Sequence, residues 1–395
     1  MKIVVMSPTY LPVVGGAELG IFQIYRRLAA RHEVVIKTPR LPGRVNYREG
    51  EDLYFHDSRL RIERYEDLTS YNGIPLRLRP FVRRVALEYS RSAQDAARLI
   101  PADTDVVNCH YVVRNLGAIR ILVRRGIPIV TSVVGREFDL VSRNYPSWHA
   151  VGKALKKSNA VVYISEYLRS SINIIGRCDR VIPYGVDTAR YRPGPRNPDL
   201  LAQHGIAPDA DVIFSVQRLA RVKRLDILLE AFAIVASKKK NAVLLIGGTG
   251  DDEERLRMRS KELGLNASVR WCGYIPENSL PEYYRVATVV AFHSMNETFG
   301  VVIPQAMASG VPLVTTRCTA LQEVVQDGET GLLCEPGNPA ALAQSILILL
   351  SNKELARDLA DRALQEARSR YSWDRIAGEY EEVLANAAGE KTRTS

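Results

Sequence analysis

The stretch NETFGVVIPQAMASGVPLVTT, from Asn296 to Thr316, combines a polar loop, a short helix and an apolar strand. Glu297 and Thr298 stand at the expected start of the helix, while Gly310 and Pro312 are residue types that end helices. The apolar run that leads to Thr316 is typical of a buried parallel strand. This succession predicts one unit of an α/β fold.

The polar start of this helix is a candidate binding site. Backbone N–H groups at a helix N-terminus have no partner inside the helix, so they attract anions and hydroxyl oxygens. Here they belong to Phe299, Gly300 and Val301. The Glu297 carboxylate could accept hydrogen bonds from ligand hydroxyl groups, or it could only cap the helix. Glycine-rich and cationic loops elsewhere in the chain favour the binding role.

Around this stretch, short apolar strands alternate with helical patterns along the 395-residue chain. One alternation runs from Ile3 to Ile164 and another from Val212 to Thr316, and a proline-rich segment lies between Pro183 and Pro208. The alternations predict a parallel, doubly wound sheet in each half, and the prolines predict a linker. We therefore expect an α/β protein with two Rossmann-like domains facing a central cleft, with binding loops at the carboxyl ends of strands.

The charge is unevenly distributed between the two halves. Residues 1–200 hold 32 Lys and Arg against 19 Asp and Glu, whereas residues 201–395 hold 22 against 25. The basic half favours an anionic membrane surface or an acidic substrate as partner. Nucleic acid is disfavoured, because no recognisable reading module accompanies the charge.

One basic segment has an amphipathic pattern. Arginines alternate there with apolar residues from Leu76 to Val85; the arginines of this region are Arg77, Arg79, Arg83, Arg84 and Arg91. Such a segment can lie on an anionic membrane or bind an acidic acceptor. A solvated helix face is the equally weighted alternative.

The compartment follows from what the sequence does not contain. The five cysteines have no metal or redox spacing, no apolar run is long enough to cross a bilayer, and the N-terminus does not read as a signal peptide. We expect a cytoplasmic protein, with peripheral contact to the inner face of the cell membrane as a further expectation.

Three other loops carry residue types that suit a phosphate-bearing ligand. Gly15 and Gly16 follow the first strand and allow the backbone to approach a phosphate, although a tight turn is the commoner explanation. Arg218 and Lys223 follow a later strand and could clamp a diphosphate, although most basic residues are merely solvated. Gly248 lies in a glycine-rich turn that could approach a nucleotide or only shape the chain.

Polar candidates in the first half are fewer. His110 ends an apolar strand, where a catalytic role in the cleft and a structural role have about equal weight. Arg136 and Asp139 follow another strand and could contact an acceptor or a sugar.

These motifs together resemble the retaining glycosyltransferases of family 4, also described as glycosyl transferases group 1, which have the GT-B fold. The resemblance covers nearly the whole chain and is strongest from Asp211 to Pro336. The family signature is a Glu, seven residues and a second Glu, which fall on Glu297 and Gln305 here. The cations that bind the donor diphosphate in the family fall on Arg218 and Lys223.

The resemblance also implies roles for the glycines and exposes departures. Gly15 and Gly16 match a Gly-Gly pair near the nucleotide diphosphate and acceptor. Gln305 replaces the Glu that holds the ribose hydroxyls; it keeps hydrogen-bonding capacity and loses the charge. Val134 replaces a His close to the donor sugar, and Gln217 replaces a Gly before Arg218.

The resemblance implies transfer of a sugar from a nucleotide sugar to a glycan, a lipid-linked acceptor or a small molecule, with retained anomeric configuration. Residues 1–185 would bind the acceptor and 186–371 the donor, and a last helix near residues 372–386 would pack back onto the first domain. The two Asp-x-Asp spacings of the chain, Asp103–Asp105 and Asp209–Asp211, precede apolar strands and do not follow them, so we expect no metal and no other cofactor. The alternatives are a catalytically weakened or inactive GT-B protein that binds sugar nucleotides in a regulatory or partner role and, less favoured, a sugar-nucleotide epimerase.

Overall fold

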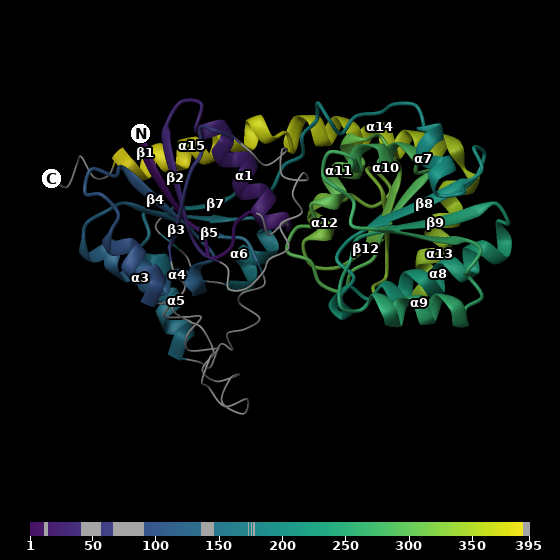
Figure 1. Cartoon of the computed structure of the whole chain (residues 1–395), viewed down its shortest axis with the longest axis horizontal. Coiled ribbons are helices and arrows are strands. Elements are labelled where there is room, and N and C mark those ends of the chain that lie inside the picture. Colours follow the sequence, from purple (N-terminus) through teal and green to yellow (C-terminus); the bar gives the residue numbers. More distant parts are fainter. Residues whose placement is uncertain are drawn as a thin grey trace. The chain divides into compact units, whose positions relative to one another are not determined.

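The computed structural model describes residues 1–11, 15–40, 57–65, 91–135, 146–172, 174, 176 and 178–389. The chain divides into two compact units, each built on a parallel sheet (Figure 1). Unit 1 comprises Met1–Tyr184 and Trp373–Ser395, and unit 2 comprises Gly185–Ser372.

Unit 1 has a seven-stranded parallel sheet in the order β3-β2-β1-β4-β5-β6-β7. Its strands are β1 (Lys2–Met6), β2 (Glu33–Pro39), β3 (Arg61–Tyr65), β4 (Val106–His110), β5 (Ile129–Val133), β6 (Ala160–Tyr163) and β7 (Asp179–Val181). Its helices are α1 (Gly16–Leu28), α3 (Arg91–Arg98), α4 (Val112–Arg124), α5 (Pro146–Lys157), α6 (Glu166–Ile172) and α15 (Trp373–Gly389). Helix α15 packs against α1 and β4.

Unit 2 has a six-stranded parallel sheet in the order β10-β9-β8-β11-β12-β13. Its strands are β8 (Asp211–Val216), β9 (Ala242–Gly247), β10 (Val269–Gly273), β11 (Val289–Phe292), β12 (Leu313–Thr316) and β13 (Leu332–Cys334). Its helices are α7 (Pro198–Gln203), α8 (Leu225–Lys238), α9 (Glu253–Glu262), α10 (Leu280–Val286), α11 (Val302–Ala308), α12 (Leu321–Val324), α13 (Pro339–Ser351) and α14 (Lys353–Arg370), and a 3₁₀ turn, η3, spans Arg221–Lys223.

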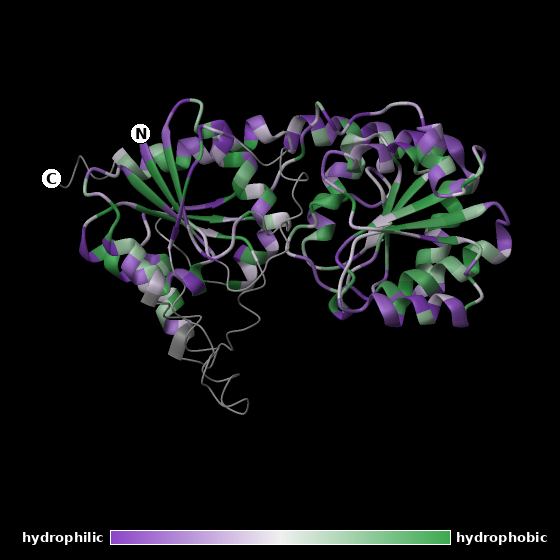
Figure 2. Ribbon diagram, viewed as in Figure 1, coloured by the Kyte–Doolittle hydropathy of each residue, from purple (hydrophilic) through white to green (hydrophobic). Residues whose placement is uncertain are grey.

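The core of unit 2 lies between its sheet and the helices α8 and α13. Leu228 and Phe232 of α8 and Leu342 and Ile346 of α13 are fully buried against strand residues such as Leu244. Figure 2 shows the consequence, since the strands of unit 2 and the central strands of unit 1 are mostly coloured as apolar while the helices alternate between apolar and polar faces. Burial of these side chains, each stabilising by about 1.5–3 kcal/mol, holds the strand ends in place.

The structure corrects two local expectations. Helix α11 begins at Val302 and not at Glu297 and Thr298, because Gly300 has φ +84°, which no helical residue adopts. The expected linker contains α7, whose first turn is capped by the Asn197 side chain. The sequence also predicts a strand at Leu53–Phe55, a segment that lies outside the described residues.

Each sheet has one point at which the direction of strand progression reverses. In unit 1 it lies between β1 and β4, and in unit 2 between β8 and β11. Open α/β sheets bind their ligands in the crevice beyond the strand ends at this switch point. The loops after these four strands are therefore where functional side chains are to be sought.

Candidate functional site

The switch point of unit 2 brings together two of the predicted residues. The loop after β8 carries Lys223 and the loop after β11 carries Glu297, and their side chains form an ion pair through Lys223 Nζ and Glu297 Oε1. The two side chains keep 21% and 12% of their surface exposed. An ion pair that bridges a switch point and still reaches solvent can exchange its partners for those of a ligand.

Arg218 lies on the same loop as Lys223. Its side chain is exposed, and no carboxylate pairs with it among the residues described. Arg224, the residue after Lys223, instead donates from Nε to both carboxylate oxygens of Asp226 at 3.1 Å. Arg218 is therefore a cation open to an anionic ligand, whereas Arg224 is engaged by its neighbour.

Gly248 has a packing role in the structure. The loops after β8 and β9 run side by side, joined by Gln217 N–H to Gly247 O at 3.1 Å and Leu219 N–H to Thr249 O at 3.0 Å. A Cβ on Gly248, whose φ is +118°, would lie 1.9 Å from the carbonyl oxygen of Gln217. Only Gly fits there, because the two backbones touch. The need for Gly at this position thus has a structural cause independent of any ligand.

Thr319 holds the backbone of Glu297, and sequence reasoning did not find it. Its Oγ1 accepts a hydrogen bond from the Glu297 N–H at 2.8 Å and donates one to the Glu297 carbonyl at 2.6 Å. A threonine after a strand matches no motif, so the sequence carried no signal for it.

Gln305, the position of the second family Glu, lies in a buried polar network. The Tyr284 hydroxyl donates to Gln305 Oε1 at 3.0 Å, and Gln305 Nε2 donates to the Tyr191 hydroxyl at 3.1 Å. Tyr191 in turn donates to Glu277 Oε1 at 2.6 Å, and burial raises the pKa of Glu277 to about 7. Both ends of the Gln305 amide thus have protein partners, which supports a structural role beside the predicted one.

The remaining residues of the opening stretch lie in the loop before α11. Thr298 is half-buried, and the buried Phe299 ring packs edge-on against Tyr371 at a centroid distance of 6.0 Å. Val301 is the N-cap residue of α11. The N–H groups of Phe299 and Gly300 therefore precede the helix and do not belong to its first turn.

His293, at the end of β11, is a second residue that the sequence reasoning passed over. It is buried, its Nε2 accepts a hydrogen bond from the Gly337 N–H at 3.2 Å, and burial lowers its pKa to about 4. The ring is therefore neutral at pH 7 and beside the loop that carries Glu297. A histidine directly after an apolar strand was the available signal.

At the switch point of unit 1, Gly15 and Gly16 start helix α1. Gly15 is the N-cap residue, and a Cβ there would lie 2.5 Å from the carboxylate of Glu18. Glu18 is buried and accepts a hydrogen bond from Thr9 Oγ1 at 2.6 Å. The N-terminus of α1 was predicted to bind a phosphate. The structure places the Glu18 carboxylate beside it.

His110 lies in the core of unit 1. It is fully buried, its Nε2 is 3.1 Å from the Tyr25 hydroxyl, and its ring stacks on Tyr380 at 6.5 Å. Burial lowers the pKa of His110 to about 3, so the ring is neutral. This placement favours the structural role and gives no support to a catalytic one. Val134 is likewise buried.

Arg136, Asp139 and the basic residues from Arg77 to Arg84 lie outside the described residues. Among the positions that the structure describes, no group of three or more His, Cys, Asp or Glu side chains is arranged to hold a metal ion. No helix in the described ranges has the length and apolar character needed to span a membrane.

Solved structures show which class of fold this is. HepE of Anabaena, solved with UDP and glucose, aligns with a TM-score of 0.77 at 19% identity, covering 98% of this chain and 99% of HepE. Sucrose-phosphate synthase of Thermosynechococcus elongatus aligns with a TM-score of 0.76 at 22% identity, covering 97% and 98%. The fold is GT-B, as predicted.

Family models and relatives then define the family. The model described as "Glycosyl transferases group 1" matches residues 197–366, and "Glycosyltransferase Family 4" matches residues 14–190. N-acetyl-alpha-D-glucosaminyl L-malate synthase of Bacillus anthracis is 25% identical over 95% of both chains. D-inositol 3-phosphate glycosyltransferase of Corynebacterium urealyticum is 36% identical over 51% of this chain and 50% of its own length. The chain belongs to the group 1 glycosyltransferases and is an enzyme of that class.

Proposed function

We propose that the protein transfers a sugar, with retained anomeric configuration and without a metal ion, from a nucleotide sugar held by unit 2 to an acceptor hydroxyl bound by unit 1. The observation that carries the proposal is the Lys223–Glu297 ion pair at the switch point of unit 2, with the exposed Arg218 on the same loop. A cation pair suits a diphosphate, and a carboxylate suits sugar hydroxyls.

The cations act on the leaving group. As the bond to the sugar breaks, negative charge develops on the departing diphosphate, and a preorganised cation stabilises that charge more than it stabilises the ground state. Arg218 and Lys223 have this role in place of a metal. Donor binding exchanges the ion pair of Lys223 for phosphate contacts and leaves the Glu297 carboxylate free to accept hydrogen bonds from the sugar.

The anomeric configuration is retained if the acceptor hydroxyl attacks the sugar from the same face as the one from which the leaving group departs. The leaving phosphate then takes the proton of the acceptor hydroxyl, so no general base from the protein is needed. The neutral, buried state of His110 is consistent with this assignment, because its ring reaches Tyr25 and Tyr380 and not solvent.

The names of similar proteins support particular donors and acceptors for testing. HepE has been solved with UDP and with UDP-glucose, which supports a uridine diphosphate sugar as the first donor to test. Two relatives are named for L-malate and inositol 3-phosphate, both anionic small molecules. The basic excess of residues 1–200 suits an acceptor that carries a carboxylate or phosphate, whether small, glycan or lipid-linked.

A thermal-shift screen against UDP-, GDP- and ADP-sugars tests the donor assignment, because a ligand that binds only the folded state raises its melting temperature. Transfer to an acceptor panel follows, with and without EDTA, and the product anomer is read by NMR. An inverted product, or activity lost with EDTA and restored by a divalent cation, would contradict the proposed mechanism. Tight binding without transfer across the panel would favour the alternative, a catalytically inactive sugar-nucleotide-binding protein, to which Val134 and Gln305 point.

A further inference from the structure

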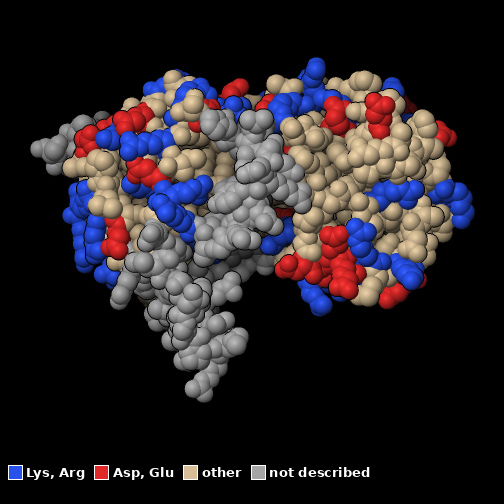
Figure 3. Space-filling view, viewed as in Figure 1, with Lys and Arg blue, Asp and Glu red and all other residues tan. Residues whose placement is uncertain are grey.

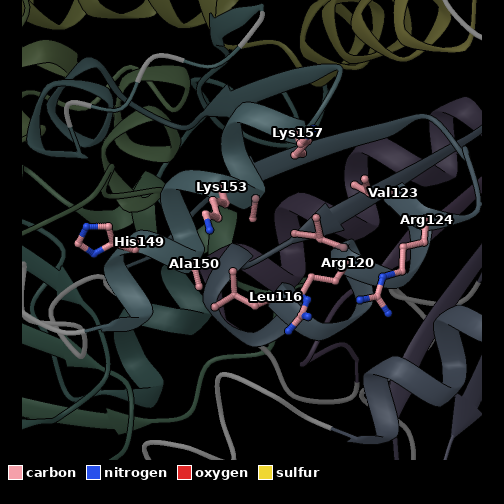
Figure 4. Close-up of a pocket in the computed structure, with 10 residues that line it drawn as sticks. Leu116, Arg120, Val123, Arg124, His149, Ala150, Lys153 and Lys157 are labelled. Atoms are coloured by element: carbon pink, nitrogen blue, oxygen red, sulfur yellow. The ribbon is translucent and has the colours of Figure 1, made fainter.

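A basic groove lies between helices α4 and α5 of unit 1. The two helices pack side by side, and a cavity of about 680 Å³ opens between them. Four cations line it, two from each helix: Arg120, Arg124, Lys153 and Lys157. Each pair has the i, i+4 spacing that places side chains on one helix face. Figure 4 shows the labelled side chains coming from two neighbouring helices.

The floor of this groove is apolar. Ile119 and Val123 of α4 and Ala154 of α5 also line the cavity, and Ile119 and Ala154 are buried. The cations themselves are exposed. Long basic side chains can lie along apolar surface while their charged ends stay in water, so the groove offers both an apolar bed and a cationic rim.

The two helices that line the groove carry no acidic side chain to balance its charge. Helices α4 and α5 contain no Asp or Glu, and no carboxylate of the described residues pairs with any of the four cations. The charged helices of unit 2 differ, since α9 pairs Arg257 with Glu253. In the view of Figure 3, Lys and Arg gather along the left edge of unit 1, while Asp and Glu cluster at the lower edge of unit 2. Like charges held together favour an anionic partner.

We propose that the α4–α5 groove binds anionic phospholipid and docks unit 1 on a membrane surface. A phospholipid supplies both complements, a phosphate for the cationic rim and an acyl region for the apolar floor. Each Lys or Arg near an anionic bilayer strengthens partition about fivefold. This membrane contact does not depend on the chemistry at Glu297. It involves the four cations of the groove and not the Arg77–Arg84 segment that the sequence suggested.

Co-sedimentation of the full chain with vesicles tests the proposal. We expect binding to vesicles that contain phosphatidylglycerol, weakened by salt, and none to phosphatidylcholine alone. The double variant Arg120→Glu/Lys153→Glu should lose at least about 30-fold in partition. The matched control Arg357→Glu/Arg368→Glu, at exposed positions of α14, carries the same charge change and should bind like the parent protein.

Three outcomes would overturn the proposal. Undiminished binding of the groove variant would show that other residues hold the membrane. Equal loss in both variants would show that net charge alone matters. Full competition by soluble glycerol phosphate would identify a free phosphate as the ligand. Circular dichroism and melting temperature of each variant establish that it is folded, and Arg120→Gln/Lys153→Gln repeats the test without charge reversal.

A second inference concerns Thr319, in the loop after β12. Its φ of +39° lies in the left-handed region, which costs energy for a β-branched residue. The conformation persists where surrounding bonds fix it, and Thr319 Oγ1 bonds both the N–H and the carbonyl of Glu297. Thr316, in β12, also holds the loop after β11, because its Oγ1 donates a hydrogen bond to the Ser294 carbonyl at 2.6 Å.

We infer that Thr319 is a positioning residue that fixes the backbone of Glu297, and through it the carboxylate, at the switch point. The inference rests on the proposed role of Glu297. Thr319→Val keeps the shape and removes the hydroxyl, so it should lower kcat about 10- to 100-fold while leaving the acceptor KM unchanged. Thr319→Ser should retain activity, and Thr319→Gly should be as slow as Thr319→Val although it relieves the strained φ.

The outcomes separate this inference from the proposed function. Full activity of Glu297→Gln would refute the role of Glu297 itself. A slow Glu297→Gln enzyme together with a fully active Thr319→Val enzyme would refute only the positioning role. In the Glu297→Gln background, Thr319→Val should bring no further loss of kcat, whereas a merely structural residue would still lower it.

Discussion

The two switch points of this protein have the same topology and different chemistry. In unit 2 the loops after β8 and β11 present Lys223, Glu297 and Arg218, which reach solvent. In unit 1 the end of β4 is a buried contact between His110 and Tyr25. The topology therefore shows where a site can form in each sheet. The polarity and exposure of the side chains decide at which of the two switch points charged groups can contact a ligand.

The largest effect expected from this difference is on turnover. Arg218→Ala and Lys223→Ala should each lower kcat/KM by about 100- to 1,000-fold, because each removes a charge aimed at the leaving diphosphate. Steady-state transfer assays with the donor found by thermal shift measure the loss. Arg357→Ala, at an exposed position of α14, is the control and should behave like the parent enzyme. Full activity in both site variants would remove the distinction between the two switch points.

In unit 1 the expected effect is on stability. His110→Ala empties a fully buried site and should lower the free energy of unfolding by about 2–4 kcal/mol, while kcat of the folded enzyme changes little. Tyr25→Phe, which removes only the hydroxyl partner, should cost about 1 kcal/mol. Denaturant unfolding and activity below the unfolding transition give the two numbers. Loss of kcat at unchanged stability would restore the catalytic interpretation of His110.

Buried titratable groups of the two units should respond to pH in opposite directions. The folded pKa of Glu277, about 7, lies above its usual 4.5, so its contribution to stability is complete below pH 4.5 and is lost as pH rises through 7. The folded pKa of His110, about 3, lies below its usual 6.5, so its contribution is lost as pH falls below 6.5.

Glu277→Gln isolates the first of these contributions. Because the amide stays neutral, the variant should be more stable than the parent by about 1–3 kcal/mol at pH 8 and similar at pH 4.5. Melting curves across this range measure the difference. A variant that is less stable at every pH would show that the Tyr191–Glu277 hydrogen bond outweighs the burial of charge.

The smallest effect is expected at Gln217, which replaces a family Gly beside Arg218. Its side chain is 9% exposed, and neither amide atom has a hydrogen-bond partner in the described part of the chain. Since an unpaired buried amide costs about 1–3 kcal/mol, Gln217→Ala should leave stability unchanged or slightly higher. If the amide serves the donor, the donor KM should rise several-fold, which steady-state kinetics will detect. An unchanged KM would restrict the site to its charged residues.

Much of the fold could be predicted from local pattern. The sequence pattern predicts strands at Val106–His110 and Val289–Phe292 and a helix at Leu280–Val286. These are the bounds of β4, β11 and α10, because apolar runs bounded by polar residues or breakers define them. The four-residue α12 and the three-residue β13 were not predicted, since a run that short has no readable period. The late start of α11 depends on the conformation of Gly300, which composition does not reveal.

The candidate site was predictable where motifs carried it and not where tertiary contact did. Lys223 and Glu297 were predicted from their loops and from the family resemblance, and the structure adds that they form an ion pair. Other contacts depend on side chains that only the folded chain brings together. They are the hydrogen bonds between Thr319 and Glu297 and those of Gln305 with Tyr284 and Tyr191. Sequence spacing contains no information on such contacts.

The paired loops after β8 and β9 have a consequence for how a ligand is received. Gln217 and Leu219 donate hydrogen bonds to the loop after β9, and the two backbones are in contact at Gly248. These contacts extend the sheet beyond its strands and hold both loops in one ordered surface. A ligand that binds to these loops pays little entropy for ordering the protein chain, because the chain became ordered when it folded. The cost of recognition is then moved from each binding event to the single event of folding.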